Sequence, residues 1–245
     1  MADYENYTKF IDTIVDGEGF INFKKNPAYK DVLEHVNYNQ GSQYLEYIKT
    51  TTNITDYEIA EYCEVNDLLG NPEKFVYGNL NTSPSSLRYI FHAYLILSHI
   101  KSLSLPTINI VEVGGGYGGL CLAVNHFANK YNVKINSYTI IDLSSPIKLQ
   151  QLYLKTLNQT PNVSFVDANT FGESIAQNNM FMISNYCFSE ISTSFRKSYI
   201  EKLIPKVSHG FMAWNAIPVF NFGFKLKIED EYPNTGGQYN KYVYF

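Results

Sequence analysis

A chain of 245 residues with 45% hydrophobic residues is long enough to bury a full core and form one sizeable domain with an appended subdomain. Its net charge of −4 comes without any basic stripe or arm, which argues against binding to nucleic acid. The three cysteines, Cys63, Cys121 and Cys187, are widely spaced and form no C-x-x-C pair. This usage argues against a disulfide framework and a zinc site and favours a reducing compartment.

The N-terminal stretch "MADYENYTKFIDTIVDGEGF" is acidic and lacks the basic region and apolar core of a signal peptide. No apolar run approaches the ~20 residues that a membrane-spanning helix needs. We therefore expect a cytoplasmic protein without a membrane span.

Residues 1–80 contain short helical patterns, such as "YENYTKFIDTIV" and "TDYEIAEYCEVNDLL". Gly41, the Gly70-Asn71-Pro72 stretch and Gly78 interrupt them. We expect residues 1–80 to form a helical lid or substrate-recognition subdomain, and residues 81–245 to form the main domain. In the main domain, "SPSSLRYIFHAYLILSHI" predicts a helix that Ser83 caps and Pro84 starts.

From about Lys101 onward, apolar runs alternate with helical patterns. The strands expected from these runs are Ile108–Val113, Ile135–Asp142, Val163–Ala168, Met180–Asn185 and Gly210–Trp214. The segments "FKLKIEDEY" and "KYVYF" flank a Gly-Gly turn region and predict a closing antiparallel hairpin. The expected fold is α/β, with a doubly wound, Rossmann-like sheet of seven strands and a C-terminal antiparallel hairpin, preceded by the helical lid.

The stretch "VEVGGGYGGL" follows the first of these strands and contains five glycines. Gly114, Gly116 and Gly119 match G-x-G-x-x-G, which holds a dinucleotide pyrophosphate. Gly114, Gly116 and Gly118 match G-x-G-x-G, by which many methyltransferases hold S-adenosylmethionine. Glycines allow positive φ and close approach of a ligand, and the N–H groups of the next helix attract an anion. Both cofactors use these properties, so the glycines alone do not choose between them.

Three acids lie at or next to the carboxyl ends of the expected strands: Glu112, Asp142 and Asp167. A pyrophosphate would repel a carboxylate at position 112, whereas the ammonium and sulfonium groups of S-adenosylmethionine would attract it. Asp142 could bind ribose hydroxyls and Asp167 the adenine amino group, because ligands of open α/β sheets bind at the carboxyl ends of the strands. We therefore favour S-adenosylmethionine. The expected cofactor-binding residues are Glu112, Gly114, Gly115, Gly116, Tyr117, Gly118, Asp142, Leu143, Asp167, Ala168, Asn185 and Arg88.

The stretches "VEVGGGYGGL", "TIIDLSSPIKLQQLYL", "ISNYCFSEIS" and "SPSSLRYIFHAY" resemble a family of sugar O-methyltransferases of class I, found in bacterial polysaccharide clusters and in some large viruses. The resemblance covers residues 77–214. It implies methyl transfer from S-adenosylmethionine to a sugar hydroxyl of a glycan, such as that of a deoxyhexose like rhamnose. For a viral member it implies the host cytoplasm.

Methyl transfer to a hydroxyl needs in-line alignment and a general base. Glu190, after the fourth strand, is the first choice for the base, and helix capping is its alternative role. His92 and His35 are the alternative bases. Asn185 and Tyr186 would orient cofactor or sugar, and Trp214 with Asn215 would contact the sugar.

Arg88 could bind the methionyl carboxylate through its planar guanidinium, and Tyr117 could cover the methionine moiety. No adjacent acid pair follows the fourth strand, so we expect no metal. Two other functions stay open. One is an NAD-linked oxidoreductase, which G-x-G-x-x-G alone supports, and the other is a non-catalytic module of methyltransferase fold that binds a glycan or a protein.

Overall fold

The computed structural model describes residues 2–15, 18–160 and 162–245. Its chain forms two compact units. Unit 1 comprises Met1–Leu95, Gly116–Phe127 and Lys148–Thr160, and unit 2 comprises Ile96–Gly115, Ala128–Ile147 and Pro161–Phe245. The chain passes from unit 2 to unit 1 inside the glycine loop, between Gly115 and Gly116. A functional division at residue 80 stays a prediction.

Helices occupy the N-terminal part of the chain and alternate with strands in the rest. They are α1 (Ala2–Val15), η1 (Glu18–Lys25), α2 (Pro27–Leu33), α3 (Tyr38–Thr51), α4 (Asp56–Asn66), α5 (Pro84–Ser102), α6 (Gly119–Ala128), α7 (Ser144–Leu157), η2 (Ala168–Thr170), α8 (Thr193–Lys202) and η3 (Ile204–Lys206). Two of the N-terminal helices begin with capping boxes, at Asn37 and at Thr55, which satisfy the first free N–H groups. Among the residues that the structure describes, no helix is long and apolar enough to cross a membrane.

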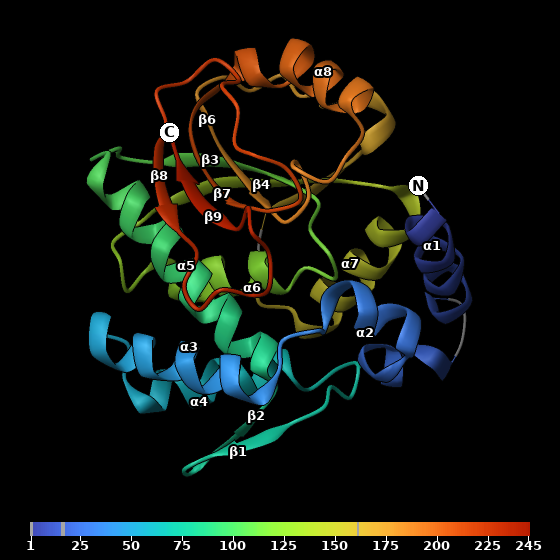
Figure 1. Ribbon diagram of the computed structural model, residues 1–245, viewed down its shortest axis with the longest axis vertical. Helices are drawn as coiled ribbons and strands as arrows, with labels where there is room; N and C mark the ends of the chain where they lie inside the picture. The colour runs from blue at the N-terminus through green and yellow to red at the C-terminus, as the bar shows by residue number, and fades with distance from the viewer. Residues whose placement is uncertain (1, 16–17, 161) are drawn as a thin grey trace. The chain divides into compact units, whose positions relative to one another are not determined.

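The main sheet of seven strands lies in unit 2 (Figure 1). Its strands are β3 (Ile108–Val113), β4 (Ile135–Asp142), β5 (Val163–Asp167), β6 (Met180–Asn185), β7 (Val207–Trp214), β8 (Lys227–Asp230) and β9 (Lys241–Tyr244). They follow the order β5-β4-β3-β6-β7-β9-β8. The first five in this order pair in parallel, and β9 pairs antiparallel with both β7 and β8.

This topology confirms the predicted α/β fold with its closing antiparallel hairpin. The chain leaves the central strand β3 toward β4 and β5, and then returns to β6 on the other side. Such a reversal is the switch point at which open α/β sheets bind ligands, outside the carboxyl ends of the strands. Here the switch point lies between β3 and β6.

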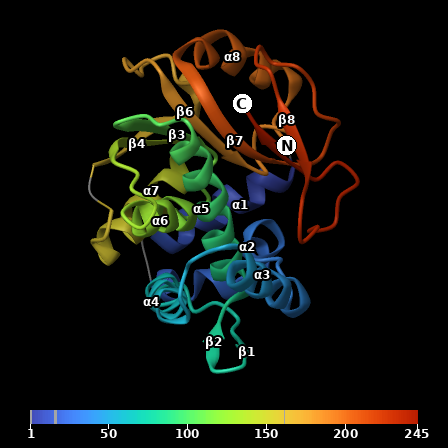
Figure 2. The same ribbon diagram turned by 90° about the vertical axis from the view of Figure 1, so that its left-hand side faces the viewer.

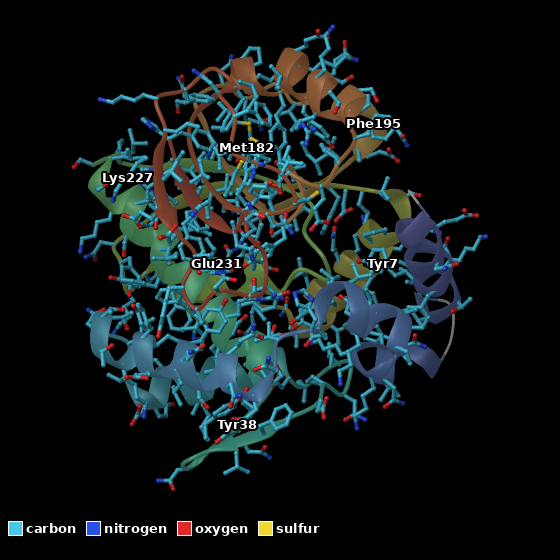
Figure 3. The ribbon with its side chains drawn as sticks, viewed as in Figure 1. Tyr7, Tyr38, Met182, Phe195, Lys227 and Glu231 are labelled. Carbon is cyan, nitrogen blue, oxygen red and sulfur yellow. The ribbon has the colours of Figure 1, made fainter. Side chains whose placement is uncertain are left out.

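One face of the sheet carries the main apolar core of unit 2. Val111, Met182 and Met212 from neighbouring strands pack with Tyr199 of α8 and Phe188 of the preceding loop. Met182 is labelled on β6 in Figure 3. Burial of this apolar surface fixes the strand register, because a slip by one residue would turn these side chains to the opposite face.

The last turns of α5 cover part of the opposite face. His99 contacts the rings of Phe181 on β6 and Tyr244 on β9, with ring centroids 5.6 Å and 5.4 Å apart. The strands are therefore buried on both faces by helices of unit 2, as the continuous apolar runs predict.

Unit 1 contains a short hairpin that the sequence does not predict, formed by β1 (Phe75–Tyr77) and β2 (Leu80–Thr82). Figure 2 shows this hairpin beside α4. The expectation that Gly41 interrupts the N-terminal helices is wrong, because Gly41 lies inside α3. A Cβ at Gly41 would lie 2.1 Å from the phenol oxygen of Tyr77, so the glycine permits the hairpin to approach the helix.

Candidate functional site

The glycine loop after β3 adopts backbone conformations that side chains disfavour. Gly114, Gly116 and Gly118 have φ values of 80°, 57° and 99°. A Cβ at Gly114 would lie 2.5 Å from the Cβ and the Sγ of Cys187, which follows β6. Glycine is therefore required at position 114 by both its backbone and its neighbour. The contact brings together the chain after β3 and the chain after β6, at the switch point of the sheet.

Asp142, the last residue of β4, holds the start of the glycine loop. Its Oδ2 accepts a hydrogen bond from the backbone N–H of Gly115 (2.9 Å), and its Oδ1 accepts one from the N–H of Leu143 (2.8 Å). The N–H of Gly114 donates to the carbonyl of Ile141 (3.0 Å). The acid at the end of β4 thus fixes the loop that the sequence predicts to bind the cofactor.

Asp142 and Asp167 are register partners on the parallel strands β4 and β5. Their carboxylates therefore lie at the same edge of the sheet, as the sequence predicts. Asp167 also starts η2, since its Oδ1 accepts from the N–H of Asn169 (2.8 Å). Leu143 and Ala168 follow these acids directly.

Glu112 is buried, with 1% of its surface exposed. Its Oε2 accepts a hydrogen bond from the hydroxyl of Tyr138 (2.8 Å). Burial raises the pKa of Glu112 to about 8; the Tyr138 hydrogen bond opposes this rise and the charge of Asp142 adds to it. At neutral pH the carboxyl is therefore mainly protonated, and the repulsion of a pyrophosphate at this position is weaker than the sequence suggests.

The end of β6 is tied to both neighbouring strands. The hydroxyl of Ser184 donates to the carbonyl of Val113 (2.9 Å) and accepts from the N–H of Phe188 (3.0 Å). The Oδ1 of Asn185 accepts from the N–H of Ala213 (3.3 Å) on β7. The loop after β6 is therefore held to the sheet by side chains as well as by the backbone.

Tyr186 has a φ of 56°, which is uncommon for a residue with a side chain. Its hydroxyl donates to Oε1 of Glu231, which lies after β8 and is labelled in Figure 3. Glu231 is 3% exposed, and its Oε2 accepts from the N–H and the hydroxyl of Thr235 (2.7 and 2.8 Å) and from Nδ2 of Asn240 (2.7 Å). The sequence does not predict Glu231, because it lies 45 residues from the tyrosine that it holds.

Glu190 and Asn215 lie side by side: Nδ2 of Asn215 donates to Oε1 of Glu190. The hydroxyl of Ser189 accepts from the N–H of Asn215 (3.1 Å), which fixes this pair of loops. The cap of α8 is Ser192, whose hydroxyl accepts from the N–H of Phe195 (3.3 Å). The alternative capping role of Glu190 therefore finds no support, since Glu190 precedes the cap and its carboxylate is exposed.

Cys187 follows β6 and contacts the position of a Cβ added at Gly114, and the sequence offers no signal for it. Burial raises the pKa of its thiol, and the carboxylates of Asp142, Glu190 and Glu112 add to the rise. Within the described ranges, no group of three or more His, Cys, Asp or Glu side chains is placed to hold a metal ion.

Trp214 ends β7 but lies in the core, with 1% of its surface exposed. Its ring packs against Phe188, Phe220 and Phe222, and its Nε1 donates to the carbonyl of Ile217 (2.7 Å). No open face of the indole is available for stacking on a sugar. Its observed contacts are those of a packing residue.

The remaining predicted residues lie in unit 1. Arg88 on α5 is 3% exposed and donates from Nη2 to the carbonyl of Leu33 (3.0 Å). His92, one turn later, is 1% exposed, and burial and the charge of Arg88 hold its pKa well below the usual range. The same two causes lower the pKa of His35 to about 4. Both imidazoles are neutral at pH 7, but the buried ring of His92 offers little access to a substrate.

Tyr117, inside the glycine loop, is fully buried in unit 1. Its ring lies 4.9 Å from that of Tyr153, and its hydroxyl accepts a hydrogen bond from Nδ2 of Asn66 (3.0 Å). The Nζ of Lys24, also buried, lies 4.1 Å from the centre of the ring. Tyr117 therefore anchors the second half of the glycine loop in the core of unit 1.

No family model matches the chain, and no curated protein matches it. Several solved structures are similar. A S-adenosylmethionine-dependent methyltransferase from Aquifex aeolicus has a TM-score of 0.45 and 14% identity, over 60% of this chain and 87% of that one. The N-methyltransferase NodS from Bradyrhizobium japonicum, in complex with S-adenosyl-L-homocysteine, has a TM-score of 0.38 and 13% identity, over 49% of this chain and 59% of that one.

A third similar structure is PKMT2 from Rickettsia typhi in complex with S-adenosylhomocysteine, with a TM-score of 0.40 and 21% identity. It is matched over 53% of this chain and 26% of that one. This chain thus spans less than two thirds of the length of NodS and of PKMT2. The Aquifex aeolicus protein and NodS are described as methyltransferases, and NodS and PKMT2 are in complex with S-adenosylhomocysteine.

Proposed function

We propose that this chain is a S-adenosylmethionine-dependent methyltransferase whose acceptor is a sugar hydroxyl. The observation that carries the proposal is the sheet order, in which the antiparallel β9 lies between β7 and β8. In the dinucleotide-binding Rossmann order, the sixth strand lies directly beside the fifth. The closing hairpin is the arrangement expected of class I methyltransferases, and it supports S-adenosylmethionine over NAD.

The residues at the carboxyl edge of unit 2 fit the nucleoside part of this cofactor. Asp142 and Asp167 are register partners, so one carboxylate can accept from ribose hydroxyls and the other from an adenine amino group. Gly114 and Gly115 place backbone next to the first of these acids without side chains. Glu112 would contribute a carboxyl whose ionisation a nearby cation favours.

When bound, S-adenosylmethionine supplies an activated methyl group. In this proposal the exposed carboxylate of Glu190 would take the proton of the acceptor hydroxyl as the oxygen bonds to the methyl carbon and the bond from that carbon to the sulfonium sulfur breaks, which leaves S-adenosylhomocysteine. Asn215 holds that carboxylate through its amide, and Ser189 holds Asn215. Tyr186, held by Glu231, would contact the acceptor.

The sugar acceptor rests on the resemblance of "SNYCFSE" and "SPSSLRY" to sugar O-methyltransferases. Calorimetric titration of the full chain with S-adenosylhomocysteine, with NAD in parallel, tests the cofactor. We expect binding of S-adenosylhomocysteine alone. Binding of NAD alone would make the chain an oxidoreductase candidate, and binding of neither would make the glycine loop an architectural turn. A screen of methylated products from deoxyhexose-containing glycans then tests the acceptor.

A further inference from the structure

The connection between β8 and β9, residues 231–240, lies at the carboxyl edge of the parallel strands of unit 2. Asp230, the last residue of β8, pairs with Lys241, the first residue of β9, and Lys241 pairs with Trp214 at the end of β7. β7 in turn runs parallel beside β6. The connection is therefore at the same edge as the end of β6, the edge at which open α/β sheets bind ligands.

Glu231, the first residue of this connection, has a carboxylate whose two oxygens meet different partners (Figure 3). Its Oε2 accepts hydrogen bonds from the N–H and the hydroxyl of Thr235 (2.7 and 2.8 Å) and from Nδ2 of Asn240 (2.7 Å). An N–H group and an amide nitrogen can only donate, so Oε2 is an acceptor for them. Oε1 accepts from the hydroxyl of Tyr186. Both oxygens are thus fixed as acceptors by groups of unit 2.

The direction of the Tyr186 hydrogen bond decides what this half-buried side chain offers to a ligand. A phenol has a single hydroxyl proton, and here that proton is donated to Glu231. Toward any other group the phenol oxygen is therefore an acceptor. The backbone of Tyr186 is held as well, since its N–H donates to the carbonyl of Ala213 (2.7 Å) on β7.

Glu190, on the same loop after β6, has the same polarity. The hydroxyl of Ser189 donates to Oδ1 of Asn215, which turns the amide nitrogen of Asn215 toward Glu190. Glu190 is exposed, and its carboxylate oxygens accept hydrogen bonds. The loop therefore carries acceptor oxygens on two side chains, Tyr186 and Glu190, and a matching ligand brings donor groups to both.

The backbone is strained in both loops that form this place. Tyr186 after β6 has a φ of 56°, and Ala216 after β7 has a φ of 59°. Residues with a Cβ rarely adopt such values, and these conformations cluster at ligand sites, where the surrounding structure holds them. The strain is independent of the hydrogen-bond directions, and it falls on the same two loops.

We propose that Tyr186 selects the acceptor by taking a hydrogen bond from a second hydroxyl, and that Glu231 is the positioning residue that fixes this polarity. The inference rests on the proposed function and deepens it, because Glu190 would take the proton of the hydroxyl that is methylated. The acceptor class is then a polyhydroxy compound with at least two free hydroxyls. A methyl ether at the second position has no proton to donate, so a reaction that methylates that position must follow this one.

The test replaces single hydroxyls of the acceptor by fluorine, which is similar in size and has no proton to donate. The probes are the methyl glycoside methylated fastest in a panel of hexosides and deoxyhexosides, and its analogues with fluorine in place of each other hydroxyl in turn. The value of kcat/KM with S-adenosylmethionine is measured for the full chain, for Tyr186→Phe and for Glu231→Gln. Glu229→Gln is the matched control, because Glu229 is an exposed glutamate on β8.

The readout is the preference for the parent glycoside, the ratio of its kcat/KM to that of an analogue. Fluorine also changes the reactivity of the sugar, but this effect is common to all variants and cancels when their preferences are compared. For one analogue, the preference should be about three- to tenfold lower in Tyr186→Phe than in the wild type, which corresponds to one lost hydrogen bond. Glu229→Gln should keep the wild-type preference for every analogue.

Glu231→Gln tests the polarity itself. Thr235 and Asn240 donate to the position of Oε2, so the amide oxygen of the glutamine should occupy it and the amide nitrogen should face Tyr186. The phenol oxygen then accepts from this nitrogen, and its proton turns toward the ligand. The preference should therefore fall at the same analogue as in Tyr186→Phe, although the phenol oxygen is still present.

Three outcomes would overturn the inference while the proposed cofactor stands. Equal preferences in the wild type and Tyr186→Phe for every analogue would mean that Tyr186 accepts no hydrogen bond from the sugar. Equal losses of Glu231→Gln on the parent and all analogues would make Glu231 a structural residue. Binding of S-adenosylhomocysteine by a wild type that methylates no glycoside of the panel would exclude the polyhydroxy acceptor. Failure to bind S-adenosylhomocysteine would instead remove the proposed function.

Discussion

Gly114 and Cys187 approach so closely that a Cβ on the glycine would lie 2.5 Å from the sulfur. The two residues follow β3 and β6, the strands that flank the switch point of the sheet. Their contact therefore fixes how closely the chain after β3 approaches the chain after β6, at the place where open α/β sheets bind ligands. This close approach gives the glycine a role that its conformational freedom alone does not explain.

Gly114→Ala should destabilise the chain by about 1–3 kcal/mol, because it combines a strained φ with a clash. Gly223→Ala is the control: its φ is 111° and nothing lies within 4 Å of the added Cβ. Urea denaturation should show a larger loss for Gly114→Ala. Equal losses at the two positions would mean that Cys187 yields to the added carbon at little cost.

Asp142→Asn should lower the affinity for S-adenosylhomocysteine at least about tenfold, because an amide cannot replace both carboxylate oxygens. The carboxylate holds the N–H groups of Gly115 and Leu143, so a stability loss of about 1 kcal/mol should accompany it. Titration calorimetry measures the affinity, with Asp230→Asn on the exposed strand β8 as the control. Wild-type affinity in Asp142→Asn would restrict the aspartate to holding the loop.

Glu190→Gln should reduce methyl transfer at least about 100-fold, since the amide cannot take a proton. The affinity for S-adenosylhomocysteine should stay unchanged. Glu201→Gln, at an exposed glutamate of α8, should leave both properties unchanged. Turnover is measured as methylated sugar once an acceptor is identified, and retained turnover in Glu190→Gln would exclude Glu190 as the base.

Stability should fall as pH rises between about pH 5 and pH 8 because of Glu112. Its pKa is raised from 4.5 to about 8, so the folded chain holds a proton that the unfolded chain releases across this window. One such proton changes the free energy of unfolding by up to about 1.4 kcal/mol per pH unit.

Glu112→Gln keeps an acceptor for Tyr138 and removes the titration. The stability of the wild type relative to this variant should therefore decline with pH in urea denaturation. A difference that stays constant across the window would show that Glu112 is ionised in the folded chain.

The sequence predicts the sheet well because its strands are continuous apolar runs with clear ends. Ile108–Val113, Ile135–Asp142 and Met180–Asn185 are observed with the expected bounds. The N-terminal part is harder to predict, because its helices depend on tertiary contacts. Gly41 reads as a helix breaker in isolation, but it lies inside α3, where the close approach of Tyr77 leaves no room for a Cβ.

The candidate site also contains residues that the sequence predicts and residues that only the tertiary structure reveals. The strand-end acids Asp142 and Asp167 are predictable, since parallel strands end at one edge. Cys187 and Glu231 are not, because no local pattern marks them and their contacts join distant parts of the chain. The site roles of the predicted residues stay predictions until the titrations are made.

The orientation of Tyr186 is set by Glu231, which lies outside the "SNYCFSE" stretch. Thr235 and Asn240 in turn fix that carboxylate. Substitutions in the 231–240 loop therefore change how Tyr186 is held, without altering the stretch itself. Under the proposed function, chains with the same glycine loop and the same "SNYCFSE" stretch can therefore differ in acceptor preference through this loop, and a comparison of these stretches alone would miss the difference.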